Sequence, residues 1–284
     1  MLGRNMLQWS RGNTEIGSEL RNMGKLKIAT FNANSIRARL PVILDWLAAE
    51  APDALCVQET KAQDADFPAD ALREAGYHAA FTGQKSYNGV ALLTRAPVED
   101  PIIGLGDGAE DPEQARLVAG TVQGVPIVNT YVPQGFEPGT DKFAYKLEWL
   151  ERLGAFFARR FSPDAPLVWA GDFNIAPAPE DVYDPVKMQG ACGFHPDERA
   201  ALERLRAWGF TDVFRKLVPG PGQYTFWDYR LRGGLSRNLG WRIDHIWATA
   251  PLAERAERAW IDLAPRRLEK PSDHTFLAVE FNWP

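Results

Sequence analysis

The sequence predicts an α/β protein in which two β-sheets pack against each other and helices cover their outer faces. Short apolar runs bounded by polar turns recur along the chain, and such runs are typical of buried strands. Segments with apolar side chains at helical spacing are fewer and lie between these runs. Many strands with a few interspersed helices form the pattern of two packed sheets flanked by helices.

The expected strands are spread over the chain from residue 26 to residue 281. Two of them are separated by a short turn around Gly124, so they are expected to form a hairpin. The strand ranges are 26–31, 53–58, 77–82, 89–94, 116–122, 126–131, 167–170, 242–248 and 275–281.

Helices are expected at residues 40–51, 142–161 and 197–208. The second has the clearest pattern, because Phe143, Leu147 and Leu150 belong to an apolar stripe at helical spacing that predicts packing on the core. The third follows Pro196 and begins with acidic residues, as helix N-termini often do.

The composition is that of a globular protein, with 284 residues, 45% hydrophobic and 24% charged. Residues 25–284 contain no linker-like tract and are expected to form one catalytic domain, whereas residues 1–24 are expected to be a disordered tail. No run is long enough to cross a membrane. Two cysteines, Cys56 and Cys192, indicate no disulfide framework, so a reducing cytoplasm is expected. The protein is also expected to be a monomer. The net charge of −5 argues against a protein that coats DNA nonspecifically but permits an enzyme with a local basic face.

Polar side chains follow several expected strands directly. The tetrapeptide Gly171-Asp172-Phe173-Asn174 ends the apolar run Leu167-Val168-Trp169-Ala170, and its glycine lets the backbone turn sharply. Function concentrates at such positions, because a rigid scaffold holds them. The other members of this strand-end set are Asn32, Asn34, Glu59, Tyr131, Asp244, Asp273 and His274.

Attack of water on a phosphodiester is the chemistry that fits this set. Asp172 is placed to act as the general base, and Asn174 to hold the water. His274 is expected to donate to a nonbridging phosphate oxygen, with its tautomer fixed by Asp244. Tyr131 offers a phenol to the phosphate or to the leaving group.

A magnesium ion is the expected cofactor, with manganese as a substitute, because the candidate ligands are oxygens. Glu59 can bind it, helped by Asn32 or Asn34 and by Asp273. The cysteines are too few and too far apart for a zinc site. The chain also has no Walker loop and no nucleophilic serine elbow.

In order along the chain, the motifs resemble the exonuclease III family of apurinic/apyrimidinic endonucleases, within the endonuclease/exonuclease/phosphatase superfamily. The resemblance extends from about Lys25 to Phe281, and the ordered set is far more specific than any one motif. The motifs are residues 31–39 (FNANSIRAR), 55–61 (LCVQETK), 89–94 (GVALLT), 129–135 (NTYVPQG), 171–177 (GDFNIAP), 226–230 (FWDYR), 242–245 (RIDH) and 270–274 (KPSDH).

The resemblance implies a four-layer α/β sandwich, with two mixed and mostly antiparallel sheets and an active site at one edge. It implies a metal-dependent DNA phosphodiesterase of base excision repair that cleaves duplex DNA 5′ to abasic sites and can also act on 3′ ends as an exonuclease or trimming enzyme. The same catalytic and metal roles are implied for the strand-end set. Phe226 and Trp227 match the aromatic wall that receives a flipped abasic sugar.

The expected partner is double-stranded DNA with abasic sites or blocked 3′ ends. An acid-free stretch of thirteen residues is expected to grip backbone phosphates, while Trp241 wedges a base step. Its basic residues are Arg230, Arg232, Arg237 and Arg242, and a second strip of contacts is expected from Arg37, Arg39 and Lys61.

Two alternatives remain open on the sequence alone. One is a small-molecule or lipid phosphodiesterase or phosphatase of the same superfamily, although such relatives generally place a histidine where this chain has Tyr131. The other is a noncatalytic DNA-binding module, which the complete catalytic set argues against. His195 is expected either at a helix entry or as a modulator of pocket access, and His245 to pack within its strand.

Overall fold

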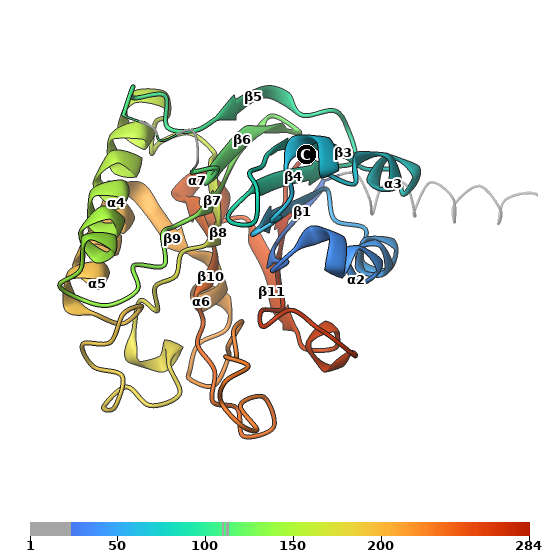
Figure 1. Ribbon diagram of the computed structural model, residues 1–284. Helices are drawn as coiled ribbons and strands as arrows, with labels where there is room; N and C mark the ends of the chain where they lie inside the picture. The colour runs from blue at the N-terminus through green and yellow to red at the C-terminus, as the bar shows by residue number, and fades with distance from the viewer. Residues whose placement is uncertain (1–23, 110, 112–113) are drawn as a thin grey trace, which may run out of the picture.

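Two six-stranded sheets pack face to face in the computed structural model, and helices cover both outer sides (Figure 1). The structure describes residues 24–109, 111 and 114–284. The expected N-terminal tail, apart from Gly24, lies outside the described residues. The interior between the sheets is apolar, with side chains such as Ile28, Leu92, Ile127 and Val168 packed in one cluster.

The first sheet has the strand order β11-β12-β1-β2-β4-β3. β1 and β2 run parallel, and every other neighbouring pair is antiparallel. The strands are β1 (Lys25–Asn32), β2 (Ala54–Gln58), β3 (His78–Thr82), β4 (Val90–Thr94), β11 (Ala256–Asp262) and β12 (Phe276–Asn282).

The second sheet has the order β5-β6-β7-β8-β10-β9. It repeats the arrangement of the first, because β7 and β8 are its parallel pair and the rest is antiparallel. Its strands are β5 (Glu99–Ile103), β6 (Leu117–Val122), β7 (Val125–Tyr131), β8 (Val168–Asp172), β9 (Phe210–Asp212) and β10 (Asp244–Thr249).

Helices on the two outer faces complete four layers, so the predicted sandwich is confirmed. α2 packs on the first sheet through Ile43 and Trp46, and α4 and α5 lie side by side on the second (Figure 1). Among the described residues, no helix combines the length and the apolar character that crossing a membrane requires. The helices are α2 (Ile36–Glu50), α3 (Ala69–Glu74), α4 (Asp141–Arg160), α5 (Pro196–Gly209), α6 (Val213–Leu217) and α7 (Ala250–Ala253), with 3-10 turns η1 (Asp64–Asp66), η2 (Pro179–Asp181) and η3 (Pro265–Arg267).

The elements that the sequence did not predict are short or lie at sheet edges. β5 and β11 are edge strands; most side chains of β5 are exposed, and those of β11 are half-buried or exposed, so both lack the apolar runs by which buried strands are found. β9 has three residues. α2 begins before the expected residue 40, because the Ser35 side chain accepts a hydrogen bond from the Ala38 amide and caps the helix there.

The two parallel pairs bring polar side chains to one edge of the sandwich. β1 and β7 end at Asn32 and Tyr131, and their parallel neighbours lead to Glu59 and Asp172. Carboxyl ends of parallel strands meet at the same edge, so each sheet contributes half of a site. The Asn32 side-chain amide donates to Asp172 Oδ2 over 2.8 Å and thereby joins the two sheets.

A second polar contact joins the sheets deeper in the core. Gln58 of β2 donates to Asn129 Oδ1 of β7 over 2.7 Å, and Asn129 in turn donates to the carbonyls of Val57 and Ala91. All of these groups are buried. A buried amide that loses its partner is costly, so this contact fixes the register of one sheet against the other.

Gly171 is required where β8 approaches β7. Its φ is +140°, and a Cβ at this position would lie 2.0 Å from the Thr130 carbonyl oxygen. Phe173, two residues after Gly171, stacks on Trp169 with ring centroids 3.8 Å apart. The glycine therefore lets the chain leave the sheet tightly enough to bury both Asp172 and the aromatic ring beyond it.

We expect Gly171→Ala to lower the free energy of unfolding by about 2–4 kcal/mol, because the new methyl group overlaps the neighbouring backbone and the φ value is strained. Gly124→Ala is the matched control. It also has a positive φ, but no atom lies within 4 Å of the added carbon, so its cost should be about 1 kcal/mol. Urea unfolding of both variants measures the difference, and equal costs would contradict the role of the close approach.

Candidate active site

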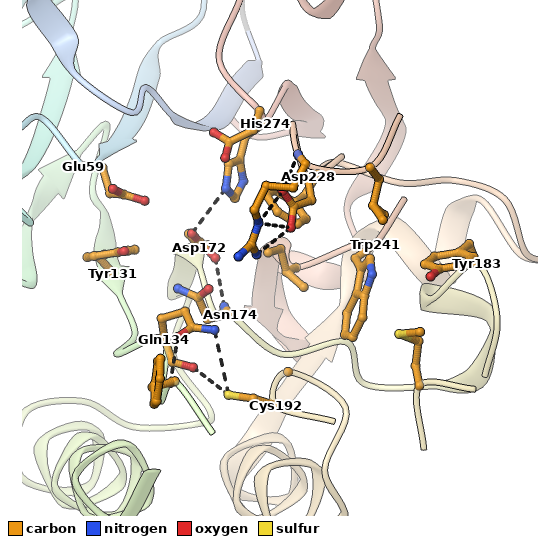
Figure 2. A pocket seen from close by; sticks show the side chains of 18 of the residues that line it. Glu59, Tyr131, Gln134, Asp172, Asn174, Tyr183, Cys192, Asp228, Trp241 and His274 are labelled. Carbon is orange, nitrogen blue, oxygen red and sulfur yellow. Dashed lines mark hydrogen bonds and ion pairs between the residues drawn. The ribbon is translucent and has the colours of Figure 1, made fainter. Parts of the chain in front are cut away.

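Most of the strand-end residues line a cleft of about 690 Å³ at the edge where the two sheets meet. This volume lies within the usual range of ligand pockets. Asn32 and Asp244 are buried and contact the lining residues Asp172 and His274 through their side chains, whereas Asn34 contacts Asp273. One wall is polar and the other apolar, and Figure 2 shows Glu59, Tyr131 and Asp172 facing Trp241 across the opening. The polar wall contains Glu59, Tyr131, Asp172, Asn174, Asp273 and His274, and the apolar wall contains Tyr183, Met188, Phe226, Leu231, Trp241 and Ile243; the charged Lys187, Asp228 and Arg230 also line the cleft.

Asp172 lies at the centre of the polar wall with a side chain that is almost fully buried. Its Oδ1 accepts a hydrogen bond from the backbone N–H of Asn174 over 2.9 Å, and its Oδ2 accepts one from the side-chain amide of Asn32. Burial and the neighbouring Asp244 raise the pKa of this carboxyl group, although His274 and the two hydrogen bonds act in the opposite direction.

His274 stands between two carboxylates. Its Nδ1 lies 2.8 Å from Asp244 Oδ2. Its Nε2 lies 3.8 Å from Asp172 Oδ2, on the side that faces the cleft (Figure 2). Burial lowers the pKa of His274, but the two carboxylates outweigh it and hold the pKa above its ordinary range. The imidazolium is therefore favoured, and it can donate from Nε2 toward the cleft.

Glu59 forms a second polar corner with the side chains of the β1 end. Its Oε1 accepts the Asn32 amide over 2.8 Å, and Asn34 donates to Asp273 Oδ1 over 2.9 Å. The Lys61 ammonium lies 2.7 Å from Glu59 Oε2 and 2.6 Å from Asn34 Oδ1. Burial raises the pKa of Glu59, but the Lys61 charge and hydrogen bonds lower it below its usual value.

This corner fits a divalent cation that prefers oxygen ligands. Glu59 and Asp273 both line the cleft, and a positive charge already bridges the Glu59 and Asn34 oxygens. Asp172, Asp244 and His274 also have ligand atoms within 4.8 Å of one another. In that second group, the Nδ1 of His274 is already engaged by Asp244, whereas Glu59 and Asp273 both face the cleft.

Tyr131 is held against its sheet by Arg116, a residue that the sequence motifs do not point to. The Arg116 guanidinium lies 5.0 Å from the centre of the phenol ring and donates to the Tyr131 carbonyl over 3.3 Å. Burial, together with Glu59 and Asp172, raises the pKa of the phenol well above its usual value. Tyr131 therefore remains a neutral hydrogen-bond donor at physiological pH. A lone arginine before a strand gives no signal in the sequence.

Two of the predicted DNA contacts are wrong. Arg242 is fully buried, with its guanidinium 2.7 Å from carboxylate oxygens of both Asp181 and Asp212, so it cannot reach DNA. Trp227 is also buried, and its indole N–H donates to Asn238. Neighbouring side chains in an extended segment point to opposite faces, and therefore Phe226 lines the cleft while Trp227 faces away. Trp241 takes the second place on the aromatic wall.

Two further basic residues bind groups of the protein itself. The Arg39 guanidinium donates to the carbonyls of Asn34 and Pro271, which links the loop after β1 to the loop before β12. Lys61 belongs to the Glu59 corner described above rather than to a surface strip. The predicted DNA contacts that are exposed are Arg37, Arg230, Arg232 and Arg237, and the Arg230 guanidinium donates several hydrogen bonds to the Asp228 carboxylate.

The two remaining histidines that the sequence singled out, His195 and His245, bind groups of the protein itself. His195 caps α5, because its Nδ1 accepts the Asp197 amide over 3.2 Å, as expected for a helix entry. His245 is buried in β10, with Nδ1 2.9 Å from Arg242 and Nε2 2.9 Å from the Ile175 carbonyl oxygen. Burial and the Arg242 charge lower the pKa of His245 to about 4.

The sequence was compared with models of protein families and with known proteins. The family model for the Endonuclease/Exonuclease/phosphatase family matches residues 29–274. The chain belongs to this family. An exodeoxyribonuclease III from Haemophilus influenzae is 34% identical over 269 residues, covering 90% of this chain and 100% of the relative. Within its family, the chain is thus a DNA-directed hydrolase of the exonuclease III type.

Solved structures of the family superimpose closely. An AP endonuclease from Archaeoglobus fulgidus is 44% identical with a TM-score of 0.87, and the match covers 90% of this chain and 99% of that chain. The 3′ phosphatase NExo from Neisseria, bound to a product DNA hairpin, is 40% identical with a TM-score of 0.87, and the match covers 91% of this chain and 100% of that chain.

We expect His245 to make this family member less stable in mild acid. Its pKa of about 4 in the folded state is below the unfolded value of about 6.5, so the unfolded chain takes up the proton first as pH falls. The stability from neutral His245 is complete above about pH 6.5 and is lost toward about pH 4, by about 2 kcal/mol between about pH 8 and pH 5.

Urea unfolding at pH 8 and pH 5 measures this contribution as a difference between proteins. The wild type should lose more stability than His245→Gln over the same interval, because glutamine does not titrate. Identical pH dependence of the two proteins would exclude His245 as the source.

Proposed function

We propose that this enzyme is a metal-dependent DNA phosphodiesterase of base excision repair that cleaves duplex DNA 5′ to abasic sites and also processes 3′ ends. One observation carries the proposal: Asp172 and His274 face the same cleft as Glu59 and Asp273, and the opposite wall of this cleft carries Phe226 and Trp241. Asp244 is buried and supports His274 through its Nδ1. The similarity to an exodeoxyribonuclease III, an AP endonuclease and a 3′ phosphatase supports DNA as the substrate. The small-molecule and lipid alternatives are not favoured by these relatives.

Asp172 is proposed to accept the proton of the attacking water. Its two oxygens are held by Asn32 and Asn174, which fixes the direction of the remaining lone pairs. The Asn174 side chain donates to the Val132 carbonyl over 3.0 Å, so the amide is fixed and its oxygen can accept a hydrogen bond from the water. With the water held in this way, its proton can pass to Asp172 as its oxygen attacks the phosphorus atom.

Charge on the phosphate is proposed to be stabilised by two donors. His274 is cationic because Asp244 and Asp172 flank it, and its Nε2–H can reach a nonbridging oxygen. Tyr131 remains a neutral phenol and can donate to the phosphate or to the leaving oxygen. Donors that are already oriented in a buried site stabilise developing charge without reorganisation.

Magnesium is the proposed cofactor, with Glu59 as its carboxylate ligand and Asn32, Asn34 and Asp273 around it. When bound, such an ion supplies Lewis-acid stabilisation of the phosphate oxygens and orients the leaving group. The residues around it keep their own tasks: Asn32 bridges Glu59 and Asp172 through one amide group and so couples the metal corner to the water-activating carboxylate.

The apolar wall is proposed to receive the base-free sugar. Phe226 and Trp241 both line the cleft, and the Phe226 ring lies 4.8 Å from the His274 ring. A nucleotide leaves the stack most readily where its base is missing. The exposed Arg37, Arg232 and Arg237 are proposed to contact backbone phosphates around the opening.

We expect wild-type protein with magnesium to cleave a duplex 5′ to an abasic analogue, and chelation by EDTA to abolish cleavage. Asp172→Ala should bind the same duplex with similar affinity while losing at least about 10³-fold in rate, because the proton acceptor is gone. Gel analysis of one preparation on abasic, 3′-phosphate and undamaged duplexes measures all three activities. Absence of any cleavage by the wild type, or full activity of Asp172→Ala, would refute the proposal.

We also expect DNA affinity to fall steeply as salt concentration rises, despite the negative net charge. Arg232→Ala and Arg237→Ala should each weaken binding and reduce the slope of log affinity against log salt by about 1. Arg204→Ala is the control, since this exposed side chain lies on α5 and pairs with Glu151. Fluorescence anisotropy of a labelled duplex gives the slopes, and unchanged slopes would exclude these two arginines as phosphate contacts.

A further inference from the structure

A fully buried ion pair lies beneath the cleft and has no role in the chemistry described so far. Lys146 of α4 and Glu198 of α5 have no exposed side-chain surface, and Lys146 Nζ lies 2.5 Å from Glu198 Oε1. A buried ion pair is weak evidence for stability, because desolvation of both charges offsets their attraction. The groups that this pair holds are therefore more informative than the pair itself.

Lys146 holds the ends of two strands of the second sheet. Its ammonium donates to the Asn174 carbonyl over 2.8 Å and to the Gln134 carbonyl over 3.2 Å. Asn174 follows β8, and Gln134 follows β7. An ammonium has three donors, and these two carbonyls together with Glu198 use all three.

Glu198 holds a third segment that approaches the cleft. Its Oε2 accepts the backbone N–H groups of Gly193 and His195 over 2.7 and 3.0 Å. Gly193 lines the cleft, as do Gln134 and Asn174. Figure 2 shows Gln134 and Cys192 lying together below Asn174, where hydrogen bonds join the two loops.

Asn174 has a left-handed backbone that turns its carbonyl and its N–H to opposite partners. Its φ is +52°, a left-handed conformation that non-glycine residues adopt at a cost and that persists where the surroundings impose it. In this conformation its carbonyl faces Lys146 while its N–H faces Asp172. One residue's backbone thus connects the buried ammonium to the carboxylate in the cleft.

We propose that the Lys146–Glu198 pair is a positioning device. It holds the backbone of Asn174 in place beside Asp172, together with the loops that contain Gln134 and Gly193. The proposal rests on the hydrolase activity proposed above. A pair that served the packing of α4 on α5 alone would be replaceable by neutral side chains of similar volume without loss of rate. A positioning pair would not.

The double variant Lys146→Met with Glu198→Gln separates these two roles. It leaves no unpaired buried charge. The new glutamine side chain still offers a carbonyl oxygen to the Gly193 and His195 N–H groups, whereas the new methionine side chain cannot donate to Asn174 or Gln134. We expect kcat on the abasic duplex to fall about 10²-fold, since small misplacements of catalytic groups have effects of this size, while KM changes less than about threefold. Unchanged kcat, or a loss confined to KM, would overturn the proposal.

Arg152→Met is the matched control on the same helix. Arg152 forms a partly buried ion pair with Asp107, so its loss perturbs α4 without touching the cleft, and kcat should stay within about twofold of the wild type.

Hydrogen exchange provides a test that does not depend on activity. Amide exchange followed by mass spectrometry should become faster in residues 132–136, 172–176 and 191–195 of the double variant and stay unchanged there in Arg152→Met. If protection of these three segments is the same in wild type and double variant, the positioning role is excluded whether or not the protein cleaves DNA. Failure of wild-type cleavage with the predicted exchange changes would instead refute the proposed function alone.

Discussion

The structure depends on keeping one carboxylate, Asp172, buried at the seam between two sheets. Each sheet alone presents half of a polar edge, and the Asn32 amide closes the seam by donating to Glu59 on its own sheet and to Asp172 on the other. A buried charge that lacked these partners would be strongly destabilising. The same contacts that make burial tolerable also place Asp172, the proposed proton acceptor, beside Glu59, the proposed metal ligand.

The two sheets reach this arrangement through constraints placed well below the cleft. Gly171 permits the close approach of β8 to β7, and the buried Gln58–Asn129 contact fixes one sheet against the other. Because strand periodicity is two, a slip by one residue would turn every polar strand end away from the cleft. The rigidity of the core is therefore the source of the precision at the edge.

Much of this could be predicted from the sequence, because apolar runs followed by polar residues identify buried strands and their ends. Most of the strand-end set of polar residues lines one cleft for that reason, and Asn32 and Asp244 are buried against its lining residues. The sequence could not reveal Arg242 as an internal residue, since its partners Asp181 and Asp212 are distant along the chain and a stretch of arginines looks exposed. Adjacent side chains in an extended segment point to opposite faces, so Phe226 and Trp227 cannot both line the cleft. This alternation can be recognised in the sequence, but the two adjacent aromatic residues look like one motif. Lys146 was hidden because the apolar stripe of its helix gives no sign of a buried charge.

The polar groups of the cleft and the residues around its opening belong to different parts of the fold, which affects how the sequence can diverge. The polar groups of the cleft stand at strand ends that the core fixes. Phe226, Trp241 and three of the exposed arginines instead belong to a loop outside the sheets, residues 219–241 (Figure 1). Substitutions in that loop can alter which DNA end or lesion fits while the acid, amide and imidazole groups stay in place. One scaffold can in this way diverge into related enzymes with different preferences and the same hydrolytic step.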